Sequence, residues 1–111
     1  MNNFEDIYPI RNCEHEINNG LVTVLYQKEK LTFIEKTFFK KDALKPYKID
    51  LDEIGSFIWH ICDGSKNVGQ ITKIAQEHFK GKIEPAKERV ELFIEQMNKN
   101  KLVKLYKKNK E

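Results

Sequence analysis

The chain has 111 residues, of which 40% are hydrophobic and 33% charged, and its net charge is only +3. A length of this order gives one domain with one core, and the composition excludes a disordered or fibrous chain. Two cysteines do not make a disulfide framework, the first ten residues lack a signal-peptide pattern, and no apolar run reaches the ~18 residues of a membrane span. We expect a single cytoplasmic domain over residues 1–111, with a core at about 14–106 and a basic tail at 107–111.

The first half of the chain has the pattern of β-strands. Glu16–Asn18 and Leu21–Tyr26 flank Asn19-Gly20, a pair that favours the type I′ turn of a two-residue hairpin. The segment Leu31–Lys41 that follows is ambiguous, because its apolar spacing favours a short amphipathic helix while its β-branched and aromatic residues also suit a strand. We predict a hairpin and then a short helix.

A further strand is predicted at Tyr47–Leu51, where apolar and charged residues alternate. Lys45-Pro46 separates it from the preceding segment, because the residue before a proline avoids the helical region. We expect Tyr47, Ile49 and Leu51 to face the core.

The second half predicts three helices joined by short turns. Asp52 suits the N-cap of the first helix, and Pro85 suits the first turn of the third. Asn67 with Gln70 resembles a capping box at the start of the second. The apolar stripes of the three helices are Ile54, Phe57, Ile58 and Ile61; Val68, Ile71, Ile74, Ala75 and Phe79; and Ala86, Val90, Phe93, Ile94 and Met97.

After these helices, Leu102–Tyr106 is either a short closing strand or an apolar extension. A small antiparallel N-terminal β-sheet followed by a three-helix bundle is the outline of an α+β, winged helix-turn-helix-like fold. That is the fold class we predict.

Four potential zinc ligands occur as two pairs, Cys13-x-His15 and His60-x-Cys62. Structural zinc pairs prefer two or more intervening residues, and on a helix two residues at this spacing point about 200° apart. We therefore expect no metal site, with Cys62 in the core and His60 partly exposed.

No catalytic constellation is evident, because Cys13 lacks His and Asp partners at a known spacing and the glycines form no phosphate loop. We expect neither an enzyme nor a cofactor. Trp59 lies off the apolar stripe of its helix, so it either closes the core against the sheet or forms an aromatic wall of a ligand site.

The lysines are unevenly placed, with seven between Lys28 and Lys48 and six between Asn98 and Glu111. Such runs are either a solvated surface or a basic rim that favours an acidic peptide or a nucleic acid. The predicted third helix carries four glutamates that disfavour contact with phosphates: Glu84, Glu88, Glu91 and Glu95.

The strand Tyr47–Leu51 offers a different kind of site. A sheet edge can accept a peptide as an added strand through main-chain hydrogen bonds. Either Lys48 on the outward face simply protects the edge from unwanted pairing, or the edge forms a peptide site together with apolar residues of the third helix.

An ordered set of motifs resembles the PqqD family: Ile49–Trp59 with its Gly and Ile-Trp pair, then Cys62-Asp63-Gly64, Val68-Gly69-Gln70-Ile71, Arg89-Val90, Phe93-Ile94 and Asn100–Val103. The resemblance covers roughly Glu16 to Val103. The chain departs from compact members of the family at residues 30–46, where an extra apolar and basic stretch intervenes.

The resemblance implies a non-catalytic recognition element for ribosomally made, post-translationally modified peptides. Such a domain binds the leader of a precursor peptide as an added strand, in a groove against the third helix, and presents it to a modifying enzyme such as a radical S-adenosylmethionine protein. With the helical spacing of the third helix, this gives the expected peptide-binding residues: Tyr47, Lys48, Ile49, Asp50, Leu51, Arg89, Leu92, Phe93 and Gln96.

The partners expected are therefore the precursor peptide and its modifying enzyme, with no membrane and with nucleic acid disfavoured. A winged-helix DNA-binding regulator is the alternative function. The open edge makes either a monomer or an edge-strand dimer possible.

Overall fold

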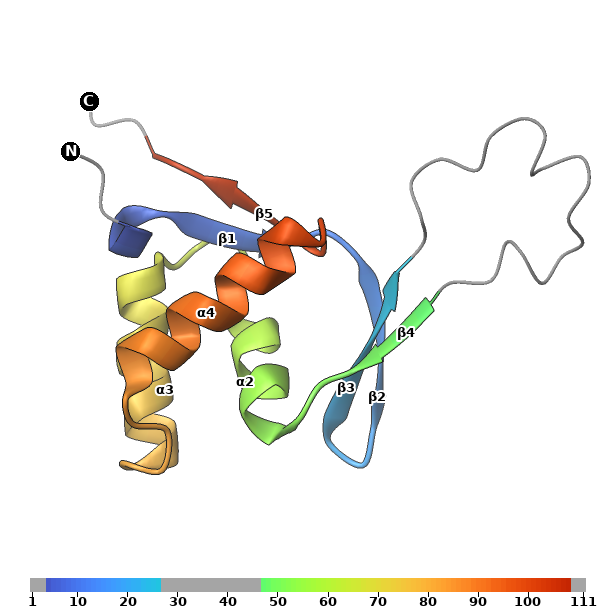
Figure 1. Ribbon diagram of the computed structural model, residues 1–111, viewed down its shortest axis with the longest axis horizontal. Coiled ribbons are helices and arrows are strands. Elements are labelled where there is room, and N and C mark those ends of the chain that lie inside the picture. The colour runs from blue at the N-terminus through green and yellow to red at the C-terminus, as the bar shows by residue number, and fades with distance from the viewer. Residues whose placement is uncertain (1–3, 27–46, 109–111) are drawn as a thin grey trace, which may run out of the picture.

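The computed structural model describes residues 4–26 and 47–108 (Figure 1). The expected helix at Leu31–Lys41 and the insertion at 30–46 lie outside the described residues. From the hairpin onward, the described elements run in the predicted order, and two elements that were not predicted precede the hairpin. The described elements are a 3-10 turn η1 (Phe4–Asp6), the strands β1 (Tyr8–Arg11), β2 (Glu14–Asn18), β3 (Leu21–Tyr26) and β4 (Tyr47–Asp50), the helices α2 (Glu53–Ile61), α3 (Val68–Phe79) and α4 (Ala86–Lys99), and the strand β5 (Val103–Tyr106). This confirms the α+β class, with antiparallel strands followed by three helices. No helix in the described part of the chain is long and apolar enough to cross a membrane.

Three strands form one antiparallel sheet in the order β2-β3-β4. The hairpin between β2 and β3 turns at Asn19 and Gly20, whose φ angles of 54° and 80° are the positive values of the predicted type I′ turn. On the core face of β3, Val22 and Val24 are fully buried. The predicted hairpin is thus confirmed, with Asn18 paired to Leu21 on either side of the turn.

The pairing of β1 with β5 was not anticipated from the sequence. Tyr8 pairs with Tyr106 and Arg11 with Val103, so the ribbon joins the first and last described strands. The Arg11 side chain also donates hydrogen bonds to the carbonyl oxygens of Trp59 and His60, at 3.0 and 2.6 Å. The C-terminal end of a helix carries a partial negative charge, so the Arg11 guanidinium at these carbonyl oxygens is stabilised by the α2 dipole. The ribbon therefore holds the end of α2 as well as β5.

Two helices begin where their caps predicted, whereas Pro85, expected in the first turn of the third helix, is the extended residue just before α4. The Asp52 carboxylate accepts the Gly55 N–H at 2.7 Å, and Asn67 and Gln70 form the reciprocal capping box with two bonds of 2.8 Å. The inward faces of the helices, with side chains of β3 and β5, form two adjoining clusters of buried side chains. One is Ile58, Cys62, Val68, Ile71, Ala75, Phe79, Ile83, Ala86, Val90 and Ile94, and the other is Val22, Val24, Leu51, Trp59, Met97, Leu102 and Val103.

Ser56, on the first turn of α2, joins this helix to the sheet. Its side chain is buried, and its hydroxyl oxygen accepts the backbone N–H of Val22 at 2.8 Å and donates to the carbonyl oxygen of Leu51 at 3.4 Å. The N–H of Leu51 in turn donates to the carbonyl oxygen of Val22 at 2.9 Å. One hydroxyl thus connects β3, the end of β4 and the start of α2.

We expect Ser56→Ala to lower the free energy of unfolding by about 1–3 kcal/mol, because it leaves the buried Val22 N–H without an acceptor. Urea titration followed by the fluorescence of Trp59 measures this. Ser65→Ala is the control, since Ser65 is exposed and water can replace the hydrogen bond that its hydroxyl donates to the Asp63 carboxylate at 2.6 Å, so the cost should be smaller, at most about 1 kcal/mol. Equal midpoints for the two variants would contradict the assigned role of the Ser56 hydroxyl.

Candidate functional site: the β4 edge and the adjoining face of α4

β4 is an edge strand in the described part of the chain, since it pairs with β3 on one side only. Backbone groups in an antiparallel strand alternate between the two sides. Because the Leu51 N–H bonds to β3, the backbone groups of Ile49 face β3 as well, and those of Lys48 and Asp50 point to the open side. The open edge therefore offers two donors and two acceptors at a spacing that suits another strand.

The side chains of β4 differ on the two faces of the sheet. On the core face, Leu51 is buried and Ile49 is half-buried. Tyr47 was expected to face the core, but it is 54% exposed and stacks on Tyr26, with ring centroids 6.4 Å apart. The prediction was wrong because this pair lies at the far end of the sheet, where β3 and β4 extend past α2 (Figure 1). On the other face, the Asp50 carboxylate accepts the hydroxyl of Thr23 at 2.8 Å.

Phe93 brings α4 up to the end of β4. It is half-buried and packs against both core clusters, together with Ile49 in the second. A Cβ atom on Gly55 would stand 3.0 Å from the Phe93 ring, 3.2 Å from the Asp52 carboxylate and 3.5 Å from Leu51, so any larger residue would push the Phe93 ring aside by a few tenths of an ångström. Gly55 was not expected to have a role of its own, although a glycine inside a helical pattern is the signal for such packing.

The other expected residues of α4 lie beside Phe93 and are exposed. Helical spacing puts Arg89, Leu92 and Gln96 on the flank of α4 next to Phe93, and Leu92 is 56% exposed. On the opposite flank, Lys87 lies 3.7 Å from the carboxylate of Glu5 in η1. The two flanks of α4 therefore face different surroundings.

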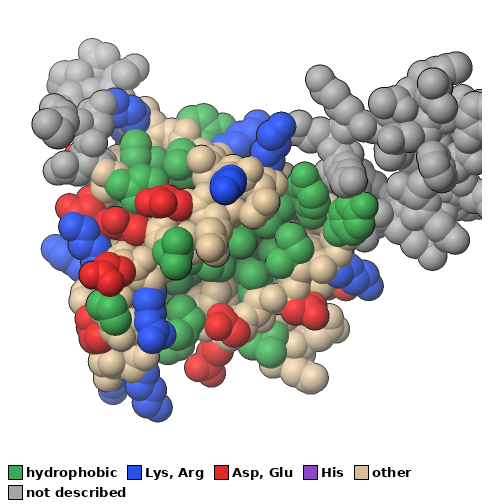
Figure 2. All heavy atoms as spheres, in the orientation of Figure 1, with side chains coloured by type: hydrophobic (Ala, Val, Ile, Leu, Met, Phe, Trp, Pro, Cys, Tyr) green, Lys and Arg blue, Asp and Glu red, His purple; other side chains and the backbone are tan. Residues whose placement is uncertain are grey.

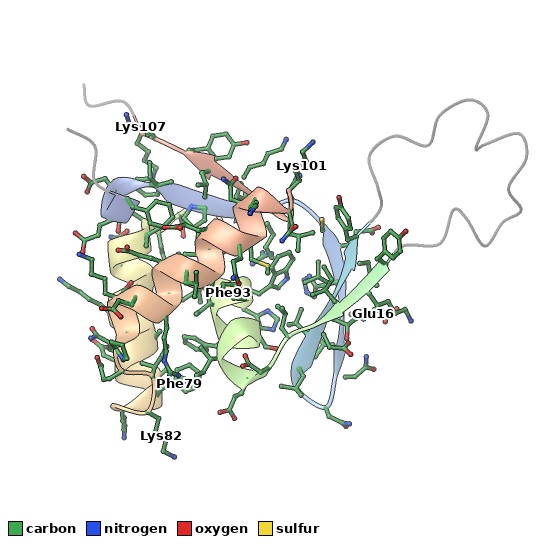
Figure 3. The ribbon with its side chains drawn as sticks, viewed as in Figure 1. Glu16, Phe79, Lys82, Phe93, Lys101 and Lys107 are labelled. Carbon is green, nitrogen blue, oxygen red and sulfur yellow. The ribbon has the colours of Figure 1, made fainter. Side chains whose placement is uncertain are left out.

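We call the nine expected residues together the β4–α4 face. They are Tyr47, Lys48, Ile49, Asp50, Leu51, Arg89, Leu92, Phe93 and Gln96. Hydrophobic side chains gather on the surface between α4 and β4 in Figure 2, and the Phe93 side chain in Figure 3 lies below α4, near α2. An open edge beside an apolar helix face can hold an extended chain by its backbone and by every second side chain.

Trp59 belongs to the core. It is fully buried in the cluster with Leu51 and Met97, and its indole N–H donates to Nδ1 of His15 at 3.1 Å. Of the two interpretations left open by the sequence, the structure therefore supports closure of the core against the sheet and excludes an exposed aromatic wall.

The two Cys/His pairs come close together but lack the features of a reactive site. The rings of His15 and His60 lie 5.8 Å apart. Burial raises the pKa of the Cys62 thiol to about 12, and burial also raises the pKa of Cys13, so both thiols stay protonated near neutral pH. Within residues 4–26 and 47–108, no three His, Cys, Asp or Glu side chains are placed to hold a metal ion.

A polar hollow lies elsewhere, between η1, the start of α3 and the Lys87 flank of α4. Its lining alternates acids, amides and lysines, namely Glu5, Asp6, Asn67, Gly69, Gln70, Thr72, Lys73, Gln76 and Lys87. It has no hydrophobic wall that would hold a peptide side chain, so the β4–α4 face is the better candidate.

We expect stability to fall on mild acidification because of His15. Burial, then the charges of His60 and Arg11, lower the pKa of His15, so the unfolded chain binds more protons. The contribution of neutral His15 to the free energy of unfolding is complete above its pKa in the unfolded chain, about 6.5, and is lost as the pH falls through its lower pKa in the folded protein. Urea midpoints between about pH 7.5 and 5 should decline less in His15→Asn, whose amide oxygen takes the place of Nδ1 and can still accept the Trp59 N–H. An unchanged decline in that variant would assign the effect to other groups.

Comparison with known proteins identifies one family. The family model described as coenzyme PQQ synthesis protein D (PqqD) matches residues 44–103, more than half of the 111 residues. The matched segment contains β4 and all of α2, α3 and α4, whereas β2 and β3 lie before it. Comparison with curated proteins and with solved structures gives no match. The match includes all nine residues of the β4–α4 face, and the chain belongs to the PqqD family.

Proposed function

We propose that this protein is a non-catalytic adaptor that binds the leader of a ribosomally made precursor peptide and presents it to a modifying enzyme. Membership of a family of accessory proteins for coenzyme PQQ synthesis supports a biosynthetic role. The observation that carries the proposal is the open edge of β4 beside the exposed, partly apolar flank of α4.

The leader would add to β4 as an antiparallel or parallel strand. Its backbone would bond to the outward N–H and C=O groups of Lys48 and Asp50. Successive side chains of the leader would point to opposite faces of the sheet. Those on the face toward α4 would pack against Phe93 and Leu92. Backbone bonds would provide affinity for any extended chain, and the two apolar side chains would select a hydrophobic residue.

Charge would refine this selection. Lys48 on the strand and Arg89 on the helix are both exposed, and both favour acidic side chains in the bound leader. The adaptor itself would need no cofactor, because the covalent chemistry would take place in the partner enzyme, for example a radical S-adenosylmethionine protein.

No observation favours the DNA-binding alternative. Glu88 and Glu95 are exposed on α4, the helix that would have to approach the phosphates. Salt dependence separates the two functions, since DNA affinity falls steeply with added salt, while strand addition depends mainly on backbone bonds and apolar contact.

We expect Lys48→Pro to abolish most leader binding, because proline removes an N–H group on the open side of β4. The fold should persist, because the backbone groups of Lys48 do not bond to β3. The measurement is an amide chemical-shift titration of the labelled protein with a synthetic leader encoded beside it. Ile17→Pro is the matched control, because Ile17 is exposed on β2 at the opposite edge of the same sheet. Loss of binding in both variants, or in neither, would contradict strand addition at β4.

We expect Arg89→Glu to weaken an acidic leader about three- to tenfold, by replacing an attraction with a repulsion at an exposed site. Lys87→Glu makes the same change in net charge on the opposite flank of α4 and should have a smaller effect. The same titration measures both variants. Equal weakening by the two would show that only total charge matters and that the leader does not lie along the Arg89 flank.

A further inference from the structure

The opposite edge of the three-stranded sheet, on β2, is also open in the described part of the chain. The N–H of Val22 donates to the Ser56 hydroxyl, and its carbonyl oxygen accepts the Leu51 N–H, so the backbone groups of Val22 point away from β2. Ile17, which stands opposite Val22, therefore makes no backbone bond to β3. By alternation the same holds for His15, and the backbone groups of both residues point outward.

The residues of this edge are accessible. Ile17 is 54% exposed, and His15 is half-buried. The other three residues of β2, Glu14, Glu16 and Asn18, are exposed. Every residue of β2 pairs with one residue of β3, so the strand has no bulge, and it contains neither proline nor lysine. These are the usual means of protecting an edge, and an exposed isoleucine on a regular edge strand favours pairing instead.

The helix α2 presents aromatic rings beside this edge. The ring of His60, which is exposed, lies 5.8 Å from the ring of His15 on β2. Helical spacing puts Phe57 on the same flank of α2 as His60. Phe57 is half-buried and stacks on the exposed ring of His78 in α3, with ring centroids 4.1 Å apart. A strand added to β2 would therefore meet Ile17 and these rings on the side of the sheet that faces α2.

The outer face of the sheet along this edge is acidic. Glu14 and Glu16 are exposed there, and neither forms an ion pair in the part of the chain that the structure describes. Glu16 lies on the side of the sheet away from α2 in Figure 3, as the alternation of a strand requires. The edge thus has an apolar and aromatic side and an acidic side. A strand with apolar residues on one face and basic residues on the other matches both.

We propose that the β2 edge docks an extended basic segment of a partner protein, in which lysine or arginine alternates with apolar residues. The outward groups of His15 and Ile17 would bond to its backbone. Its apolar side chains would pack on Ile17 and Phe57. Its cations would lie on the other face, beside Glu14 and Glu16. A second copy of β2 fits less well, because it would bring two acidic outer faces together.

This docking edge is separate from the β4–α4 face, because β3 lies between β2 and β4. A leader on β4 and a basic segment on β2 would leave each other's backbone groups free. The inference goes beyond the proposed function, since it gives the protein a contact for a partner protein at one edge of the sheet while the other edge holds the leader.

The test uses the full chain, amide-labelled, and a short capped peptide of alternating Lys and Val. We expect saturable shifts centred on the amides of His15 and Ile17. The double variant Glu14→Lys/Glu16→Lys should weaken the peptide about tenfold or more. Glu88→Lys/Glu95→Lys makes the same change in net charge at exposed positions on α4 and should weaken the peptide far less.

Two proline variants separate this edge from the leader site. Ile17→Pro removes an outward N–H that makes no bond to β3, so it should abolish most binding of the Lys-Val peptide and leave the fold intact. Lys48→Pro, at the opposite edge, should leave this binding unchanged. The order of the two variants is the reverse of that expected with the leader, so failure at one edge leaves the conclusion about the other standing.

The proposal is wrong if no saturable shift occurs, if the shifts centre on β4, or if the two double variants weaken the peptide equally. Dilution of the protein without peptide is the remaining control. Shifts of the His15 and Ile17 amides with protein concentration alone would identify a second copy of the chain as the occupant of the edge, and this too would overturn the proposal.

Discussion

The position of the β4 edge depends on the buried hydroxyl of Ser56. This one group accepts from Val22 in β3 and donates to Leu51 at the end of β4, from the first turn of α2. The helix cannot tilt or slide on the sheet without leaving a buried N–H unpaired, which costs about 1–3 kcal/mol. The next residue toward the N-terminus, Gly55, admits the Phe93 ring, so the same helical turn fixes α4. Strand edge and helix face are therefore set by adjacent residues.

The strands β4 and β5 stand in different relations to α4. β4 meets the middle of this helix through Phe93, whereas β5 follows its end directly. The turn between α4 and β5 is tight, with Lys101 at φ 64° and the Leu102 N–H donating to the carbonyl oxygen of Met97 at 2.8 Å. One helix thus orients both strands.

Local signals predicted most of the fold. Asn19-Gly20 fixed the hairpin, and Asp52, Asn67 and Gln70 marked the starts of two helices, because caps and turns act over a few residues. The β1 strand was missed because its partner lies at the far end of the chain and four residues carry no periodicity. For the site, spacing put Phe93 and its neighbours on one flank of α4, but the exposure of Tyr47 depends on where α2 stops covering the sheet, which only packing decides.

The β1–β5 ribbon sets the order in which the chain can be completed. Its strands are separated by nearly the whole sequence, so a nascent chain exposes β1 long before β5 has been synthesised. Until then, β1 is held by the backbone bonds of Pro9 and Arg11 to the α2–α3 loop and by the bonds of the Arg11 side chain to the end of α2. The hairpin and the helices have mostly local partners and can form first. Closure of the ribbon therefore has to wait for β5, at a stage when the hairpin and the helices can already have formed.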